Sequence, residues 1–401
     1  MSNKQRQVPA IRFTGFNDSW EQRKLGEVSE ITKLAGFEFT KYIKYSDTGH
    51  ILAIRGLNVK NGNFVFNDVK YIDESDFSKL SRSKLFAGDI VFTYVGTIGE
   101  AAIIPENVTW YLAPNVSRIR TTELNPTFLL QLLINPVFRR KEIETWIATS
   151  SQPALSMENI RKFEMNIPSH KEQTKIGKFF NNLDKTIALH QRQLDYYKEF
   201  KKTMLQKMFP REGEKVPSVR FDGFTVAWEH RKFSDLIQTM RGGASIAPDD
   251  YKDNGVATVP KGAINSTGIA DLSGSKYVSK EFFEKNKNSS VYSDELVTSL
   301  RDLVPSAPNM GRIVKLKGKD QRYLMPQGVY NLILQDEVDE NFLISFSNTS
   351  KFRRIISQEK NGSTQVHIRN SEYLGISIII PDSEEQNKIG SFFKKLDVTI
   401  A

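Results

Sequence analysis

The sequence predicts an α+β protein in which two tandem, strand-rich domains are linked by long coiled-coil helices and related by a pseudo-two-fold axis. Three observations support this prediction. The run from Lys171 to Phe209 has the spacing of a long helix, its beginning recurs near the end of the chain, and the segment that opens the chain recurs in the middle. Because two separate segments repeat at nearly the same offset, one structural unit is used twice.

The long helix is predicted over Lys171–Phe209, a stretch without proline. Apolar residues recur at alternating steps of four and three, which is the heptad pattern of a coiled coil. A helix of this length extends roughly 58 Å, which is too long for one compact domain to cover, so we expect a partner helix along it. The expected pairing positions in this helix are Ile176, Phe180, Leu183, Ile187 and Leu194.

The chain supplies a candidate partner in Pro381–Ala401, which matches Pro168–Ala188 at 13 of 21 positions. The sequence ends at Ala401, so this second copy is shorter than the first, and whether that end is natural or a truncation stays open. We hypothesise that the distal half of the first helix, Leu189–Phe209, lacks an intramolecular partner. The expected pairing positions in the second copy are Ile389, Phe393, Leu396 and Ile400.

The segment Val8–Val28 matches Val216–Leu236 in its Arg-Phe, Gly-Phe and Trp-Glu pairs. In each copy the tryptophan is expected to be a packing anchor. The repeats place the domain boundaries as follows: a first domain over 1–170, a central helix over 171–209, a charged linker over 210–217, a second domain over 218–380 and the start of a distal helix over 381–401.

Each domain is predicted to begin with short strands and to end with helices. Short apolar runs with β-branched residues, separated by turn residues, fill the region from Ile31 to Arg120 and its second-half counterpart. Asn125-Pro126 and Asp339-Glu340 then begin helical patterns, because Asn and Asp are favoured N-caps.

Composition restricts the partners of the chain. The 401 residues carry a formal charge of +9 with a pI near 9.3, which favours a polyanionic partner without identifying it. The absence of cysteine excludes disulfides and thiolate metal sites and agrees with a reducing cytoplasm. Met1–Gln7 is polar, so we expect no signal peptide, and no apolar run of the sequence is long enough to span a membrane.

Catalytic motifs are not found, and we expect no metal or cofactor on this chain. The five histidines show no paired ligand spacing. Gly96-Thr97-Ile98-Gly99 lacks the lysine of a phosphate loop and favours a hairpin turn. Asn125-Pro126-Thr127-Phe128 resembles the amine-binding motif of adenine-N6 methyltransferases but lacks its second proline, so helix capping explains it better. The acidic run Pro248–Lys252 favours a solvated loop over a nuclease site.

Basic residues among the turn segments of both domains predict contact with DNA. Cationic side chains neutralise phosphates, whereas Arg, Asn and Gln can pair bidentately with base edges. For any single residue, ordinary surface charge is the simpler explanation, but the set in two equivalent domains favours DNA. The basic candidates are Lys33, Lys41, Lys44, Arg55 and Lys60 in the first domain and Arg241, Lys261 and Arg301 in the second.

These repeated motifs resemble the specificity subunits of type I restriction-modification systems. The resemblance covers nearly the whole chain. Its carriers are Arg12-Phe13, Gly15-Phe16 and Trp20-Glu21 with their second copies Arg220-Phe221, Gly223-Phe224 and Trp228-Glu229, the Pro-x-x-x-Glu-Gln-x-Lys-Ile-Gly-x-Phe-Phe helix starts at 168 and 381, and Lys207-Met208-Phe209.

The resemblance implies a function without catalysis. Each globular unit would be a target-recognition domain reading one half of a split sequence in double-stranded DNA, and the two long helices would pair antiparallel and set the separation of the halves. Two modification subunits carrying S-adenosylmethionine would dock on the chain, and two restriction subunits using ATP and Mg would join them. The recognition loops expected from it add Tyr94, Thr97, Asn115, Ser151 and Gln152 in the first domain and Gln327, Thr364 and Gln365 in the second.

Two alternatives belong to other classes. A self-contained nuclease or methyltransferase would need the catalytic motifs that are missing. An RNA-binding or purely structural coiled-coil protein agrees with the paired basic domains but leaves the repeated motifs unexplained.

Overall fold

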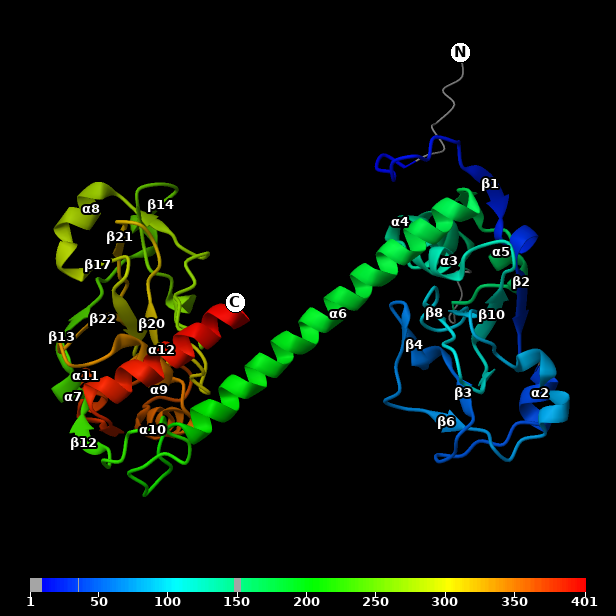
Figure 1. The fold of residues 1–401 in the computed structure, drawn as a ribbon. Helices are drawn as coiled ribbons and strands as arrows, with labels where there is room; N and C mark the ends of the chain where they lie inside the picture. The colour runs from blue at the N-terminus through cyan, green and yellow to red at the C-terminus, as the bar shows by residue number, and fades with distance from the viewer. Residues whose placement is uncertain (1–8, 35, 148–152) are drawn as a thin grey trace, which may run out of the picture. The chain divides into compact units, whose positions relative to one another are not determined.

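The computed structural model describes residues 9–34, 36–147 and 153–401. The chain divides into two compact units, Met1–Leu189 and His190–Ala401. Each unit combines short strands with helices, and the boundary between the units falls within the long helix α6 (Figure 1). The predicted α+β class with two tandem strand-rich domains is confirmed. The predicted boundaries of the domains stay predictions.

Unit 1 is built from short strands followed by helices. Its elements are β1 (Glu21–Lys24), α1 (Leu25–Val28), β2 (Glu30–Lys33), α2 (Gly36–Lys41), β3 (Leu52–Ile54), β4 (Val59–Lys60), β5 (Asn63–Phe64), β6 (Lys70–Tyr71), β7 (Ile90–Thr93), β8 (Ala101–Ile103), β9 (Trp110–Leu112), β10 (Val116–Arg120), α3 (Pro126–Leu133), α4 (Pro136–Phe138), α5 (Met157–Arg161), β11 (Glu164–Ile167) and the first part of α6 (His170–Lys207).

Unit 2 has a similar order, with most of its strands before the helices that close it. Its elements after α6 are β12 (Glu229–Lys232), α7 (Phe233–Leu236), β13 (Ile237–Gly242), β14 (Tyr251–Lys252), β15 (Val256–Ala257), β16 (Tyr277–Val278), α8 (Lys280–Lys285), β17 (Ser290–Tyr292), β18 (Leu296–Ser299), β19 (Arg301–Asp302), β20 (Ile313–Lys315), β21 (Arg322–Leu324), β22 (Val329–Leu334), α9 (Glu340–Ser347), α10 (Ser350–Glu359), β23 (Val366–His367), α11 (Asn370–Gly375), β24 (Ser377–Ile380) and α12 (Ser383–Ile400).

The central sheets of the two units have the same topology. The order is β2-β10-β7-β8 in unit 1 and β13-β22-β18-β20 in unit 2, with antiparallel neighbours throughout. In unit 1 the predicted turn at Gly96–Gly99 joins β7 to β8, and both of these glycines have positive φ. The repeat read from the sequence is therefore a repeat of topology.

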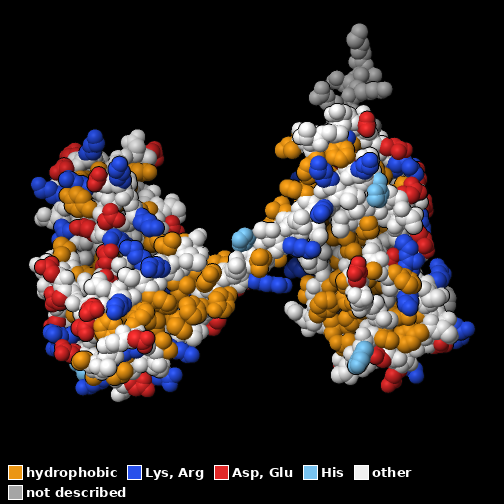
Figure 2. Space-filling model, in the orientation of Figure 1, with side chains coloured by type: hydrophobic (Ala, Val, Ile, Leu, Met, Phe, Trp, Pro, Cys, Tyr) orange, Lys and Arg blue, Asp and Glu red, His pale blue; other side chains and the backbone are white. Residues whose placement is uncertain are grey.

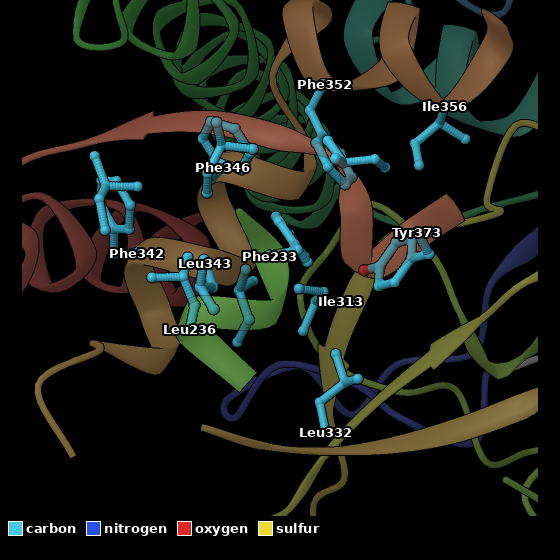
Figure 3. Close-up of a cluster of buried hydrophobic side chains, with 14 of the residues drawn as sticks. Phe233, Leu236, Ile313, Leu332, Phe342, Leu343, Phe346, Phe352, Ile356 and Tyr373 are labelled. Atoms are coloured by element: carbon cyan, nitrogen blue, oxygen red, sulfur yellow. The ribbon is translucent and has the colours of Figure 1, made fainter. Parts of the chain in front are cut away.

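Aromatic side chains dominate the core of unit 2. Phe233 stacks on Phe352 at a centroid distance of 5.4 Å, and Phe346 lies 5.2 Å from Phe352. Figure 3 shows these rings converging between helices and strands, with Tyr373 at the edge of the cluster. Burying such rings supplies most of the favourable free energy of folding.

The predicted helix caps are present in both units. The side chain of Asn125 accepts hydrogen bonds from the amides of Thr127 and Phe128, and that of Asp339 accepts one from Phe342 at 2.7 Å. Capping therefore accounts for the Asn-Pro-Thr-Phe sequence. The acidic run around Pro248 forms an exposed 3-10 turn, as expected for a solvated loop.

An arginine that opens each unit forms a buried ion pair with the helix that closes it. Arg12 donates from Nε and Nη2 to the two carboxylate oxygens of Glu172 at 2.6 and 2.7 Å, and Arg220 does the same to Glu385 at 2.7 Å each. Both glutamate side chains are fully buried. In unit 2 Trp228 Nε1 also donates to Glu385, at 3.1 Å. The repeated Arg and Glu positions thus form the same buried ion pair in both units.

The glutamine beside each glutamate fastens the same helix start to a second helix. Gln173 accepts from the amide of Asn125 and donates to Pro168 O, and Gln386 forms the equivalent bonds with Asp339 and Pro381. The glycine four residues further on allows this close approach: a Cβ on Gly390 would meet Asp339 Oδ1 at 2.0 Å. The repeated Glu-Gln-x-Lys-Ile-Gly sequence therefore forms a close contact between two helix starts in each unit, α6 with α3 and α12 with α9.

Within unit 2, the last turns of α6 cross α12 with opposed chain directions (Figure 1). Lys201 forms an ion pair with Asp397, and the Phe209 ring lies 5.9 Å from that of Phe393. Phe209 is buried. The hypothesis that the distal half of the first helix lacks an intramolecular partner is therefore wrong for its last turns, because unit 2 itself supplies the partner. Earlier in this half, Leu189 and Tyr196 are exposed.

The repeated heptad positions lie in different environments in the two units. In α12, Ile389, Phe393 and Leu396 are buried in the core of unit 2, and Ile400 is half-buried. In α6, Ile176 and Leu194 are half-buried, and the exposed positions are Phe180, Leu183 and Ile187. Pairing between the two sets of positions stays a prediction.

Substitution of Arg220 by alanine should destabilise the protein strongly. The change leaves the fully buried Glu385 without its cationic partner, which costs about 3–5 kcal/mol of unfolding free energy. Denaturant unfolding followed by fluorescence would measure this loss. The matched control is Lys285→Ala, which removes a fully exposed pair with Glu281 and should leave the unfolding free energy nearly unchanged, because water screens such a pair. Equal effects of the two changes would contradict a structural role for the buried pair.

Substitution of Lys201 by methionine should destabilise the protein more at pH 7 than at pH 4. Burial raises the pKa of Asp397, and the ion pair with Lys201 counteracts this. A carboxyl with a raised folded-state pKa contributes stability at low pH that is lost as pH rises. Without Lys201, the charged form of Asp397 has no cationic partner, so the unfolding free energy of the variant should fall below that of the parent chain by about 1–3 kcal/mol more at pH 7 than at pH 4. Thermal unfolding at the two pH values would test this, and a pH-independent loss would count against it.

Candidate nucleic-acid interface

Unit 2 has a recess of about 460 Å³ at one end of its central sheet. Four segments that are distant in sequence line it: the 3-10 turn Lys261–Ala263, the segment that follows β18, the turn before β22, and β23 with its preceding residue. Four predicted DNA-contacting residues lie in this lining, namely Lys261, Arg301, Gln327 and Gln365. The structure therefore brings together candidates that are separated by up to about 100 residues.

Backbone pairing builds the recess. Strand β19 pairs antiparallel with β23, placing Arg301 opposite His367. The amide of Leu300, which directly precedes β19, donates to Gly328 O at 3.0 Å. This hydrogen bond holds the turn before β22 beside the start of β19. Gly328 has φ +96°, and a Cβ there would lie 3.0 Å from the Arg301 side chain, so glycine is required at this position.

Unit 1 has a recess of about 500 Å³ at the equivalent position. The amide of Tyr94 donates to Asn115 O at 3.1 Å, as Leu300 does to Gly328, and Val95 forms an antiparallel bridge with Ala154, as β19 does with β23. The predicted residues that line it are Arg55, Thr97 and Asn115. The two recesses are thus one feature of the repeated fold, present twice.

The cations of the two recesses differ in availability. Arg55 donates to Asp68 at 2.7 Å, and its side chain is only 22% exposed. In unit 2, Arg301 and Lys261 are exposed and form no ion pair within the described residues. A free, exposed guanidinium or ammonium group can meet an external anion without breaking an internal ion pair, so unit 2 offers the stronger anion-binding surface.

The other predicted residues lie outside the lining of the recesses. Lys33 lies over the ring of Tyr94, 5.5 Å from its centroid, and burial raises the pKa of Tyr94. Arg241 donates to Asn331 Oδ1 at 2.7 Å and is held within the sheet. Thr364 is exposed beside Gln365. The remaining candidates are Lys41, Lys44 and Lys60, which are exposed on other parts of unit 1, and Ser151 and Gln152, which lie outside the described residues.

Contact with DNA stays a prediction for all of these residues. The recesses also contain residues that sequence reasoning missed: Asp302 and His367 in unit 2, Tyr45 and Lys70 in unit 1. Asp302 could have been found as the neighbour of Arg301. Tyr45 and Lys70 give no local signal, because they reach the recess only through the tertiary fold.

Charge alone does not mark the interface. On the face of unit 2 that Figure 2 shows, Lys and Arg side chains are interspersed with Asp and Glu. Several arginines are also engaged inside the units. Burial lowers the pKa of Arg353 to about 10, which leaves it charged at neutral pH, and it donates to the carbonyl oxygens of Met310 and Ala307 at 2.5 and 2.8 Å.

The described residues include neither a metal-binding cluster nor a helix that could span a membrane. They contain no group of three or more His, Asp or Glu side chains placed to hold a metal ion. Among the helices in the described ranges, none is both long and apolar enough to cross a membrane.

Comparison with known proteins identifies the repeat. The type I restriction modification DNA specificity domain matches residues 17–196 and again residues 225–401. Each match covers most of one strand-rich unit together with much or all of the helix that follows it, so the family repeat coincides with the repeat of topology.

Similar curated proteins are specificity subunits. The chain is 21% identical over 398 residues to the putative type I restriction enzyme MjaX specificity subunit of Methanocaldococcus jannaschii, covering 95% of this chain and 87% of the relative. It is 22% identical over 254 residues to the MjaVIII specificity subunit of the same organism, covering 61% of this chain and 58% of the relative. Over 129 residues it is 29% identical to the EcoBI specificity subunit of Escherichia coli, covering 31% and 26%.

Solved structures share the fold. The type I restriction-modification S subunit from M. genitalium matches with a TM-score of 0.53 at 12% identity, covering 98% of this chain and 92% of that one. A chain from a study of assembly and conformational transition in a type I R-M system matches with a TM-score of 0.51 at 14% identity, covering 96% and 92%.

These matches confirm the resemblance drawn from the repeated motifs and agree with a recognition component that is not itself an enzyme. With two copies of the DNA specificity domain over most of its length, the chain belongs to the family of type I restriction-modification specificity subunits.

Proposed function

We propose that each unit reads one half of a split sequence in double-stranded DNA through its recess. The observation that carries this proposal is that an equivalent recess occurs in both units, lined in each by cationic and amide side chains. Two equivalent reading surfaces on one chain suit a target with two parts.

The lining chemistry suits base edges and phosphates. An arginine such as Arg301 can donate two hydrogen bonds to O6 and N7 of guanine, and the amides of Gln327 and Gln365 can pair with N6 and N7 of adenine. Lys261 is suited to a phosphate, because an ammonium group is a point charge without the planar geometry of a base reader. The recess in unit 1 has a different lining, in which Arg55, Thr97 and Asn115 take part. The two half-sites are therefore expected to differ in sequence.

The remaining parts of the proposal concern the assembly. The chain docks two modification subunits, which carry S-adenosylmethionine and methylate adenine N6, and two restriction subunits, which use ATP and Mg for translocation and cleavage. The chain itself binds no cofactor and acts in the cytoplasm. Helix α6, which passes from one unit into the other, sets the spacing of the two half-sites.

Substitution of Arg301 by alanine should relax the methylated motif in one half only. Loss of a bidentate base contact removes about 1–3 kcal/mol of discrimination at one position. Sequencing of N6-methyladenine in cells that contain the chain and its modification subunits would show the motif. Asn115→Ala should change the other half, whereas Lys285→Ala, on α8 and outside both recesses, should leave the motif intact. If the first two variants alter the same half, or neither half, the proposal fails.

Substitution of Lys261 by glutamine should weaken DNA binding by the complex about equally for all sequences. Log affinity falls as log salt concentration rises, and each lost phosphate contact makes this slope less steep by about 0.9. Titrations at several salt concentrations would measure the slope, with Lys285→Gln as the matched loss of a surface charge outside both recesses. An unchanged slope for Lys261→Gln would exclude a phosphate contact at this position.

A further inference from the structure

The loop between β18 and β20 presents two apolar side chains at the recess of unit 2. Leu303 is 64% exposed and lines the recess, and Val304 beside it is 46% exposed. The loop covers 13 residues, 300–312, whereas the equivalent loop between β7 and β8 in unit 1 covers 7 residues, 94–100. The longer loop is therefore a feature of one reading surface and not of the repeated scaffold.

Basic side chains donate hydrogen bonds to backbone carbonyl oxygens of this loop. Arg353 donates to Ala307 O and Met310 O, Arg312 donates to Pro308 O at 3.0 Å, and Lys360 donates to Pro305 O at 2.6 Å. Ala307 and Met310 are themselves buried. Three carbonyl groups of the loop are thus bonded to cationic side chains from outside it, and a fourth is bonded to Arg312 at the end of the loop.

Such anchoring fixes the position of the exposed pair. Single exposed apolar residues are common on proteins and need no explanation. Here, two adjacent ones stand on an anchored loop, beside Arg301 and Gln327, at the recess through which we propose that unit 2 reads DNA. Pre-organisation lowers the entropic cost of binding, so an anchored apolar pair is better suited to a fixed contact than a mobile loop would be.

We propose that Leu303 and Val304 contact the C5 methyl group of a thymine in the half-site that unit 2 reads. This inference rests on the proposed function and names one base that unit 2 would recognise. In the major groove, thymine differs from the other bases by its methyl group, and apolar side chains are the groups that recognise it. The cationic and amide groups of the same recess supply the complementary polar contacts to neighbouring bases and phosphates.

The test uses the complex of the full chain with its modification subunits and a duplex that carries the methylated motif. Each thymine of the motif is replaced singly by deoxyuridine, which lacks only the C5 methyl group, and affinity is measured by competition at fixed salt concentration. We expect one thymine at which the replacement weakens binding about fourfold, the effect of one buried methyl group. In the Leu303→Ala, Val304→Ala double variant, thymine and deoxyuridine at this position should bind equally.

Controls separate this contact from other causes. Val137→Ala removes an apolar side chain that is 63% exposed in unit 1, and it should keep the fourfold preference. Because Leu303 and Val304 are exposed, the double variant should unfold at the same temperature as the parent chain.

The inference is overturned if no thymine shows a methyl effect or if the effect persists in the double variant. A loss of affinity that is the same for thymine and deoxyuridine would instead indicate an apolar wedge between base steps, which also overturns it. These outcomes leave the proposed function intact when Arg301→Ala still alters one half of the motif. If that variant has no effect either, both proposals fail.

Discussion

The structure of each unit depends on one buried ion pair that joins its beginning to the helix that closes it. A fully buried carboxylate is costly to desolvate, and only a geometrically matched partner offsets that cost. Arg220 meets this requirement with two hydrogen bonds to Glu385, and Trp228 adds a third. The indole of Trp228 packs on Phe209 and Phe342, so a single carboxylate connects the entrance of unit 2, the end of α6 and the helical core. Unit 1 repeats the ion pair with Arg12 and Glu172.

This arrangement separates the residues that stabilise each unit from the residues that line its recess. The four-stranded sheet and the helix start have the same pattern of contacts in both units, and each recess lies where the strands of that sheet end in turns. Loops at such positions can change length without disturbing the buried pair, because neither residue of the pair lies in them. The difference between the loops 94–100 and 300–312 is an example, and it gives the two units different surfaces on the same scaffold.

Features with a local cause could be predicted from the sequence. Helix periodicity, the N-caps at Asn125 and Asp339 and the repeat itself depend on residues that are close in the chain, and they are present in the structure. Environment could not be predicted in the same way. Phe180 and Phe393 occupy the same place in the repeated sequence, but only Phe393 is buried, because the end of α6 covers it. The repeat therefore predicts the secondary structure of both copies, but equivalent positions along the long helices have different tertiary contacts.

The candidate site shows the same limit. The recess of unit 2 requires pairing between β19 and β23, which are more than 60 residues apart, so no local pattern could have indicated that His367 faces Arg301. The basic residues that predicted a DNA partner also prove to have different roles. Arg241 is bonded to Asn331 within the sheet, and Arg353 holds a loop through its carbonyl groups. A net charge of +9 therefore overstates the charge available to phosphates. A bonded guanidinium must give up its internal partners before it can bind DNA, so recognition should depend on exposed, unpaired cations. Arg301 and Lys261 are two such cations among the described residues, and both line the recess that contains Gln327 and Gln365.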